Sequence, residues 1–221
     1  MRVKKEVQLA ADPVFLLREE RIDSENITKI KGRGIKKIKT LLICLRSWPD
    51  FEEKVKDIAQ GCGDFLSSSA EWKIKLLPMH YPEDLVVARK FQSYVPAAEI
   101  LTFETIGERK KILKLFLTTD MVLGMRLHSL IFSVFGAIPC IAIAYDPKIK
   151  SFVKENNIPL WNDEKCSGEE LTQLLLNEEK NSEVRKNELR EKREINISRA
   201  GLPVAYLKEI IKGEKFYAGN K

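Results

Sequence analysis

One short segment places an arginine and a histidine where an anion could bind. Residues 124–128 read Gly-Met-Arg-Leu-His and join an apolar run to a stretch of helical period. A glycine there allows a tight turn, and the N–H groups that follow begin a helix whose positive end favours anions. Arg126 offers a planar fork for a carboxylate or phosphate, and His128 can exchange a proton near neutral pH.

The alternative for this segment is structural: a salt bridge for Arg126 and a buried, hydrogen-bonded place in the core for His128. Both residues occupy one junction in otherwise apolar sequence, and the chain has only two histidines. We therefore favour a site that holds phosphate or carboxylate.

Other basic residues follow apolar runs in the same way. Arg46 comes directly after Leu-Leu-Ile-Cys-Leu, where a functional and a salt-bridged role are equally compatible with the sequence. His80, in Met-His-Tyr-Pro, is better explained as part of a polar cap. Asp146 before Pro147 predicts a helix N-cap with Lys148 in the first turn. If the runs are parallel strands, their carboxyl ends share one edge, where ligands bind.

The elements that would position these residues follow an alternating pattern. Short β-rich apolar runs alternate with segments of helical period, which predicts a Rossmann-like α/β domain with a mostly parallel sheet of about five or six strands. The predicted strands cover 40–45, 74–79, 99–102, 121–124 and 138–144. The predicted helices cover 51–65, a segment starting after 82–84, 107–117 and 127–135.

Three regions can be separated along the chain. Residues 1–39 hold no complete βα unit and are interpreted as an entry or interdomain segment. Residues 40–166 form the predicted Rossmann-like domain. Residues 167–221 have a purely helical period and high charge density, which indicates a helical extension that packs on this domain.

Composition narrows the class of protein. The 221 residues include 44% hydrophobic residues and carry a net charge of +6, enough apolar sequence for a core and too little excess charge for a dedicated nucleic-acid surface. Residues 129–145 are the only membrane candidate, but Gly136 and Pro139 divide them into helix-like and strand-like halves, so we assign them to the core.

The cysteines are interpreted as reduced, buried thiols, because their spacing suits neither zinc nor a disulfide framework. They are Cys44, Cys62, Cys140 and Cys166. With no convincing signal peptide, we expect a cytoplasmic protein, with a peripheral position at the inner membrane face as the alternative.

Several segments together resemble the polysaccharide pyruvyltransferase family. The most specific is Gly-Met-Arg-Leu-His-Ser-Leu-Ile at 124–131, followed downstream by Tyr-Asp-Pro-Lys at 145–148. Segments 11–17, 42–48 and 76–84 agree in order, so the resemblance covers residues from about 10 to about 160. Members have a two-domain fold like that of GT-B glycosyltransferases, and this chain resembles their C-terminal, donor-binding half.

The resemblance implies an activity and a set of site residues. Such enzymes transfer pyruvate from phosphoenolpyruvate to a sugar of a cell-surface polysaccharide, forming a pyruvyl ketal. The matching positions make Arg126 and His128 the candidate catalytic residues. The candidate substrate-binding residues are Arg46, Gly124, Arg126, Leu127, His128 and Lys148. The implied partners are phosphoenolpyruvate and a saccharide or lipid-linked saccharide acceptor. No carboxylate cluster in the sequence suggests a metal site, so we expect no metal, and we also expect no cofactor and no nucleic acid.

The resemblance begins near the family's interdomain segment, so we expect this chain to lack the acceptor-binding N-terminal domain; a fragment, a subunit of a split enzyme with a separate N-terminal domain, and a chain functional alone are all compatible with the sequence. Activity of this chain by itself is therefore an open question. Two other classes of function compete: a GT-B-type nucleotide-sugar glycosyltransferase domain, and a non-catalytic fragment that binds the donor or docks another polypeptide. The sequence also leaves open whether His128 gives or removes a proton.

Overall fold

A parallel sheet forms the centre of the protein in the computed structural model, which describes residues 9–17, 38–47, 51–69, 71–102, 109–144, 146–161 and 167–212. The described strands, all paired in parallel, lie in the order β3-β2-β1-β4-β5-β6. They are β1 (Lys39–Cys44), β2 (Trp72–Leu76), β3 (Glu99–Ile100), β4 (Met121–Gly124), β5 (Cys140–Ile143) and β6 (Leu160–Trp161). This order is that of a doubly wound Rossmann sheet, with its switch point between β1 and β4. The predicted fold class is confirmed.

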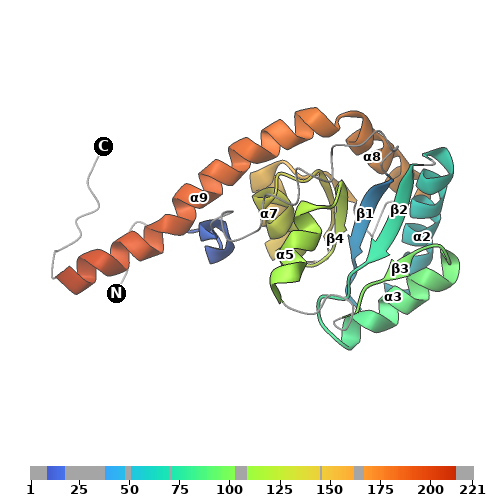
Figure 1. Ribbon diagram of the computed structural model, residues 1–221, viewed down its shortest axis with the longest axis horizontal. Coiled ribbons are helices and arrows are strands. Elements are labelled where there is room, and N and C mark those ends of the chain that lie inside the picture. Colours follow the sequence, from blue (N-terminus) through green and yellow to red (C-terminus); the bar gives the residue numbers. More distant parts are fainter. Residues whose placement is uncertain are drawn as a thin grey trace.

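Helices cover both faces of the sheet (Figure 1). One face packs against α2 (Phe51–Ser68), α3 (Glu83–Tyr94) and α8 (Gly168–Lys180). The other packs against the 3-10 helix η1 (Pro13–Leu16), α5 (Arg109–Leu117), α6 (Leu127–Phe135), α7 (Pro147–Asn156) and α9 (Ser182–Lys212). The molecule is therefore a three-layer α/β/α domain.

Strand β1 shows why both faces need cover. Leu41 and Ile43 join the core on the α2 side, while Leu42 and Cys44 join the core on the α6 side, and all four are fully buried. Alternate side chains of a strand point to opposite faces, so a strand that is apolar at every position requires a helix layer on each side.

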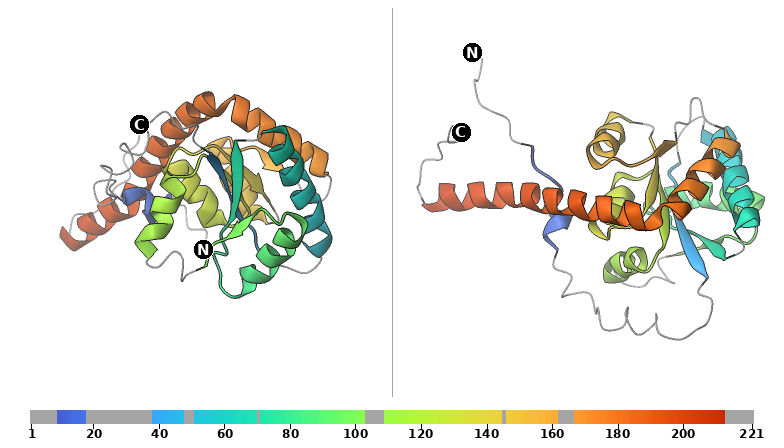
Figure 2. Two further views of the ribbon diagram at one scale, coloured as in Figure 1. Left: turned by 45° about the vertical axis from the view of Figure 1, so that its right-hand side comes forward. Right: turned by 90° about the horizontal axis from the view of Figure 1, so that it is seen from above.

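The C-terminal extension consists of two helices rather than one. Ser167 caps α8, accepting from the Glu170 N–H while the Glu170 carboxylate accepts from the Ser167 N–H. After Asn181 the chain turns into α9, which packs against α6 and η1 before it runs past the sheet (Figure 2). The sequence predicts helix here, but its period does not show where the chain bends.

Three of the observed strands, β2, β3 and β5, are shorter than predicted. Leu77, for example, lies in the loop after β2 and is only 3% exposed. Because such loop residues are apolar and buried like those of a strand, the sequence pattern predicts strands that extend too far. Among the described residues, no helix is long and apolar enough to cross a membrane. Most of the predicted entry segment, together with Tyr145 and Cys166, lies outside the described residues.

Candidate anion-binding site

Loops from three neighbouring strands form one open pocket at the carboxyl edge of the sheet. They follow β1, β2 and β4, so the pocket lies at the predicted carboxyl edge and beside the switch point between β1 and β4, where doubly wound sheets bind ligands. Its volume is about 730 Å³. The lining residues are Arg46, Ser47, Met79, His80, Glu83, Arg126, Leu127, His128 and Phe132. The structure thus brings Arg46, Arg126, Leu127 and His128 together, and their roles with substrate stay predictions.

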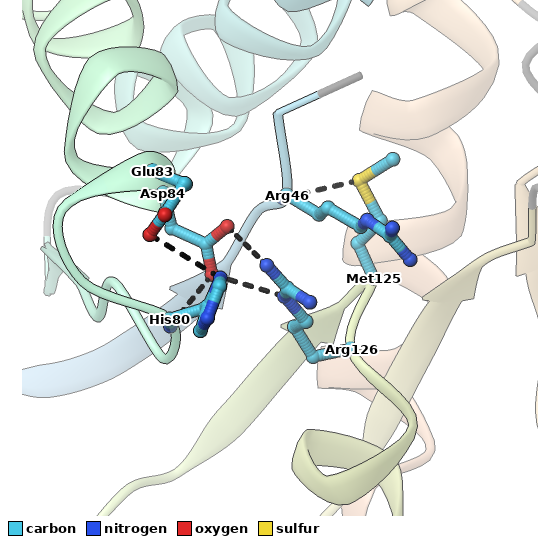
Figure 3. A network of polar contacts seen from close by, with 6 residues as sticks. All are labelled: Arg46, His80, Glu83, Asp84, Met125 and Arg126. Carbon is cyan, nitrogen blue, oxygen red and sulfur yellow. Dashed lines mark hydrogen bonds and ion pairs between the residues drawn. The ribbon is translucent and has the colours of Figure 1, made fainter.

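Arg126 is held by a carboxylate that the sequence analysis missed. Asp84, at the start of α3, has a fully buried side chain. Its Oδ2 accepts a hydrogen bond from Arg126 Nε at 3.0 Å, and its Oδ1 accepts from Nη2 (Figure 3). The salt-bridge alternative for Arg126 therefore describes a real contact, although the arginine also lines the pocket. The available signal was the Pro-Glu-Asp sequence directly after the second strand.

Asp84 also fixes the loop after β2. Its Oδ2 accepts from the His80 N–H at 2.9 Å, and its own N–H donates to the His80 carbonyl at 2.8 Å. The His80 ring lies outside this network, with Nδ1 3.3 Å from Glu83 Oε2 and 64% of the side chain exposed. The backbone of His80 therefore holds the loop to Asp84, and His80 also lines the pocket.

His128 is on the surface of the pocket rather than in the core. Its side chain is 59% exposed, and Nε2 lies 3.6 Å from Oδ2 of Asp12. The core interpretation of this histidine is wrong. Asp12 also caps η1, since its Oδ1 accepts from the Val14 N–H at 2.9 Å. His128, which could transfer a proton, therefore lies beside the carboxylate of Asp12, a residue near the N-terminus.

Arg46 enters the pocket from β1. Its backbone N–H lies 3.3 Å from the sulfur of Met125, a fully buried residue at the end of β4. Arg46 and Arg126 thus follow adjacent strands on either side of the switch point. Their convergence results from strand order, because β1 and β4 are paired although they are far apart in the chain.

The remaining predicted residues are not among those that line the pocket. Gly124 is buried, and a Cβ there would be 2.5 Å from Ser129 Oγ, so the glycine permits close packing of β4 on α6. Asp146 caps α7 by accepting from the Ile149 N–H at 2.9 Å, as predicted. Lys148 follows in the first turn, exposed, and is not among the lining residues.

Nearby carboxylates offset part of the positive charge of the basic side chains that line the pocket. Carboxylates lie beside basic side chains of the pocket: Asp84 beside Arg126, Glu83 beside His80, and Asp12 beside His128. Among the described residues, no group of three or more His, Cys, Asp or Glu could hold a metal ion. The arrangement suits binding of an anion by arginine together with proton transfer by histidine.

The thiol of Cys44, which is fully buried, is poorly suited to act as a nucleophile. Burial raises the pKa of Cys44 far above its usual range, and the Asp84 carboxylate adds to the effect. A nucleophilic cysteine needs a lowered pKa and access to substrate. Cys62 and Cys140 are also buried and free, as expected.

The fold is shared with enzymes that handle sugar nucleotides. A Neisseria meningitidis UDP-GlcNAc 2-epimerase matches with a TM-score of 0.64 and 10% identity over 92% of this chain and 54% of its own. A Listeria monocytogenes protein assigned as a UDP-N-acetylglucosamine 2-epimerase matches with a TM-score of 0.61 and 12% identity over 83% of this chain and 49% of its own. This chain therefore spans about half the length of those two proteins.

A separate C-terminal domain gives nearly complete overlap. The C-terminal domain of a group 1 family glycosyl transferase from Francisella tularensis matches with a TM-score of 0.56 and 13% identity, over 80% of this chain and 93% of that domain. At such identities the likeness shows the fold alone, that of the C-terminal half of a GT-B-type molecule.

The sequence itself identifies the family. No curated protein sequence matches the chain. The family model described as polysaccharide pyruvyl transferase matches residues 2–147, which include every described residue that lines the pocket. The chain belongs to the polysaccharide pyruvyl transferase family.

Proposed function

We propose that this chain binds phosphoenolpyruvate at the pocket and forms the donor-binding half of an enzyme that transfers pyruvate to a sugar as a cyclic ketal. The observation that carries the proposal is the meeting of Arg46, Arg126 and His128 in one pocket at the switch point. Phosphoenolpyruvate has a carboxylate and a phosphate, and arginine binds each with charge-assisted hydrogen bonds. Family membership supports the reaction class.

The chemistry needs only proton transfers and positioned anions. Two sugar hydroxyl oxygens bond to the central carbon of phosphoenolpyruvate, the methylene carbon gains one proton, and the bond from the central carbon to the phosphate oxygen breaks. The two hydroxyl protons balance the reaction, because one is matched by the new methyl hydrogen and the other leaves on phosphate. We assign the exchange of a proton to His128, and the holding of the leaving phosphate and the carboxylate to the arginines.

The acceptor is proposed to be a saccharide or lipid-linked saccharide, used at the cytoplasmic side of the membrane. The pocket volume of about 730 Å³ exceeds what a three-carbon donor fills, which leaves room for part of a sugar. Contacts to the rest of the acceptor are assigned to an N-terminal domain of the kind that the family resemblance implies. We therefore expect donor binding by this chain and little transfer without that domain.

Calorimetric titration with phosphoenolpyruvate tests the proposal. The wild-type chain should bind it, and added salt should weaken the binding. Arg126→Lys keeps a cation beside Asp84 but loses the fork, so affinity should fall roughly tenfold or more. His128→Ala should keep most of the affinity and lose ketal formation when the N-terminal domain is supplied, because a proton donor acts mainly in the transition state.

UDP-N-acetylglucosamine is the competitor to titrate in parallel. Binding of the nucleotide sugar without binding of phosphoenolpyruvate would replace the proposal with the glycosyltransferase alternative. Strong ketal formation by this chain alone would contradict the division between donor and acceptor halves.

A further inference from the structure

We propose that Asp84 is the positioning residue for Arg126: it holds one edge of the guanidinium and thereby directs the other edge into the pocket. The inference deepens the proposed function, because the anion concerned is the donor. Asp84 lines no part of the pocket itself. Its effect on the ligand would act entirely through the arginine.

The hydrogen-bond pattern defines which edge is used. A guanidinium can hold an anion side-on, through Nε and Nη2, or end-on, through Nη1 and Nη2. Asp84 takes the side-on edge, with Nε on Oδ2 and Nη2 on Oδ1. Among the described residues, none accepts from Nη1, and Arg126 lines the pocket with 22% of its side chain exposed. The end-on edge is the one left for a ligand.

Asp84 is itself fixed, so it can fix Arg126. Its side chain has no exposed surface and accepts from the His80 N–H, while the Asp84 backbone N–H donates to the His80 carbonyl. The carboxylate thus links the loop after β2 to Arg126, the N-cap of α6 after β4. A free arginine side chain loses much conformational entropy when it binds an anion. An arginine already held by Asp84 loses less, so the anion binds more tightly.

Two roles for Asp84 predict opposite effects of removing its charge. If Asp84 only neutralised Arg126, Asp84→Asn would leave more uncompensated positive charge in the site, and an anion would bind more tightly. If Asp84 positions Arg126, the same change loosens the guanidinium, and the anion binds less tightly. The sign of the change in affinity therefore separates the two roles.

The matched control is Glu83→Gln. Glu83 is the adjacent residue, lines the pocket and carries the same charge, but its partner is His80 rather than Arg126. It measures what the loss of one nearby negative charge does to anion binding. We expect equal or tighter binding of phosphoenolpyruvate in Glu83→Gln, and binding at least about fivefold weaker in Asp84→Asn.

A second readout does not depend on the ligand. In protein labelled with ¹⁵N, the Nε–H signal of Arg126, assigned by its absence in Arg126→Lys, should show an ordered side chain in the wild type and in Glu83→Gln. It should show a mobile one in Asp84→Asn. A mobile Arg126 in the wild type, or unchanged order in folded Asp84→Asn, would overturn the proposal.

Asp84→Glu covers the case in which Asp84→Asn does not fold. It keeps the charge but moves the carboxylate by one methylene. If Asp84 positions Arg126, phosphoenolpyruvate should bind more weakly to this variant; if Asp84 only neutralises Arg126, the affinity should not change. If the wild type binds no phosphoenolpyruvate, the proposed function fails, and the order of Arg126 still decides the role of Asp84. Unchanged or tighter binding in folded Asp84→Asn, or unchanged binding in folded Asp84→Glu, contradicts it.

Discussion

The backbone of Gly61 in α2 lies directly against Gly168, the first residue of α8: a Cβ atom on Gly61 would be 2.4 Å from the Gly168 carbonyl oxygen. A Cβ on Gly168 would in turn be 2.7 Å from the Asp57 carbonyl oxygen. The Thr172 hydroxyl lies 3.1 Å from the Gly61 carbonyl and 3.0 Å from that of Gly168. The C-terminal helices therefore join the domain through close backbone contact.

Gly61→Ala should destabilise the protein by about 1–3 kcal/mol, because the methyl group would overlap backbone that cannot move aside alone. Gly63, two residues along the same helix, is the control, since a Cβ there meets nothing within 4 Å. Gly63→Ala should stabilise by about 0.5–1 kcal/mol through helix propensity. Urea unfolding measures both, and equal effects of the two changes would contradict the packing argument.

The sheet and the position of the pocket could be predicted from sequence because each depends on local pattern. The runs at 121–124 and 127–135 match β4 and α6 residue for residue, since Gly136 ends the helix and Pro139 separates it from β5. The carboxyl edge followed from the general rule for parallel sheets. Arg46 and Arg126 could therefore be placed together without knowledge of the contacts between them.

The partners of the site residues could not be predicted in the same way. Asp84 is 42 residues from Arg126, and Asp12 is still further from His128. Alternation of strands and helices does not specify strand order, so it cannot say which loops touch. The Pro-Glu-Asp carboxylates suit the positive end of the helix that follows them, and this local role conceals the contact of Asp84 with another loop.

Glu179 should make stability depend on acid pH. It accepts hydrogen bonds from Lys39 Nζ at 2.8 Å, Trp72 Nε1 at 2.6 Å and Ser69 Oγ at 2.8 Å, and so ties α8 to the beginnings of β1 and β2. Burial alone would raise the pKa of Glu179, but these hydrogen bonds outweigh burial and lower it. The carboxylate therefore stabilises the fold above its ordinary pKa of 4.5, and this stability is lost as the pH falls through the lower, folded value.

Thermal unfolding from pH 7 down to pH 3 compares the wild type with Glu179→Gln. At pH 7 the variant should be less stable by about 1–3 kcal/mol, and the difference should shrink below about pH 4.5. Glu99→Gln is the control, because Glu99 is 57% exposed and pairs with Lys75 on the surface. A difference that stays constant with pH would mean that the charge of Glu179 is irrelevant.

Cys140 should contribute to loss of stability at alkaline pH. Burial, aided by the Glu178 carboxylate, raises its pKa from 9.0 to about 12. Above about pH 9 the unfolded thiol ionises while the folded thiol stays protonated, so the free energy of unfolding falls as the pH rises toward 12. Cys140→Ala should show a shallower fall between pH 8 and pH 10 in urea unfolding. Identical slopes for the wild type and the variant would contradict the raised pKa.

The Asp84–Arg126 pair should show strong, asymmetric coupling in stability. Removing the arginine leaves a fully buried carboxylate with no cation, whereas removing the aspartate leaves an arginine with 22% of its side chain exposed, which can turn toward water. Arg126→Ala should therefore cost about 2–4 kcal/mol, near the value for breaking a buried pair, and Asp84→Ala should cost less. Urea unfolding at pH 7 of the wild type, both single variants and the double variant gives the coupling energy.

The double variant should be more stable than Arg126→Ala, because no unpaired buried charge remains. Arg126→Lys should recover part of the stability that Arg126→Ala loses. Additive effects of the two alanine changes would show that the carboxylate and the guanidinium do not stabilise each other.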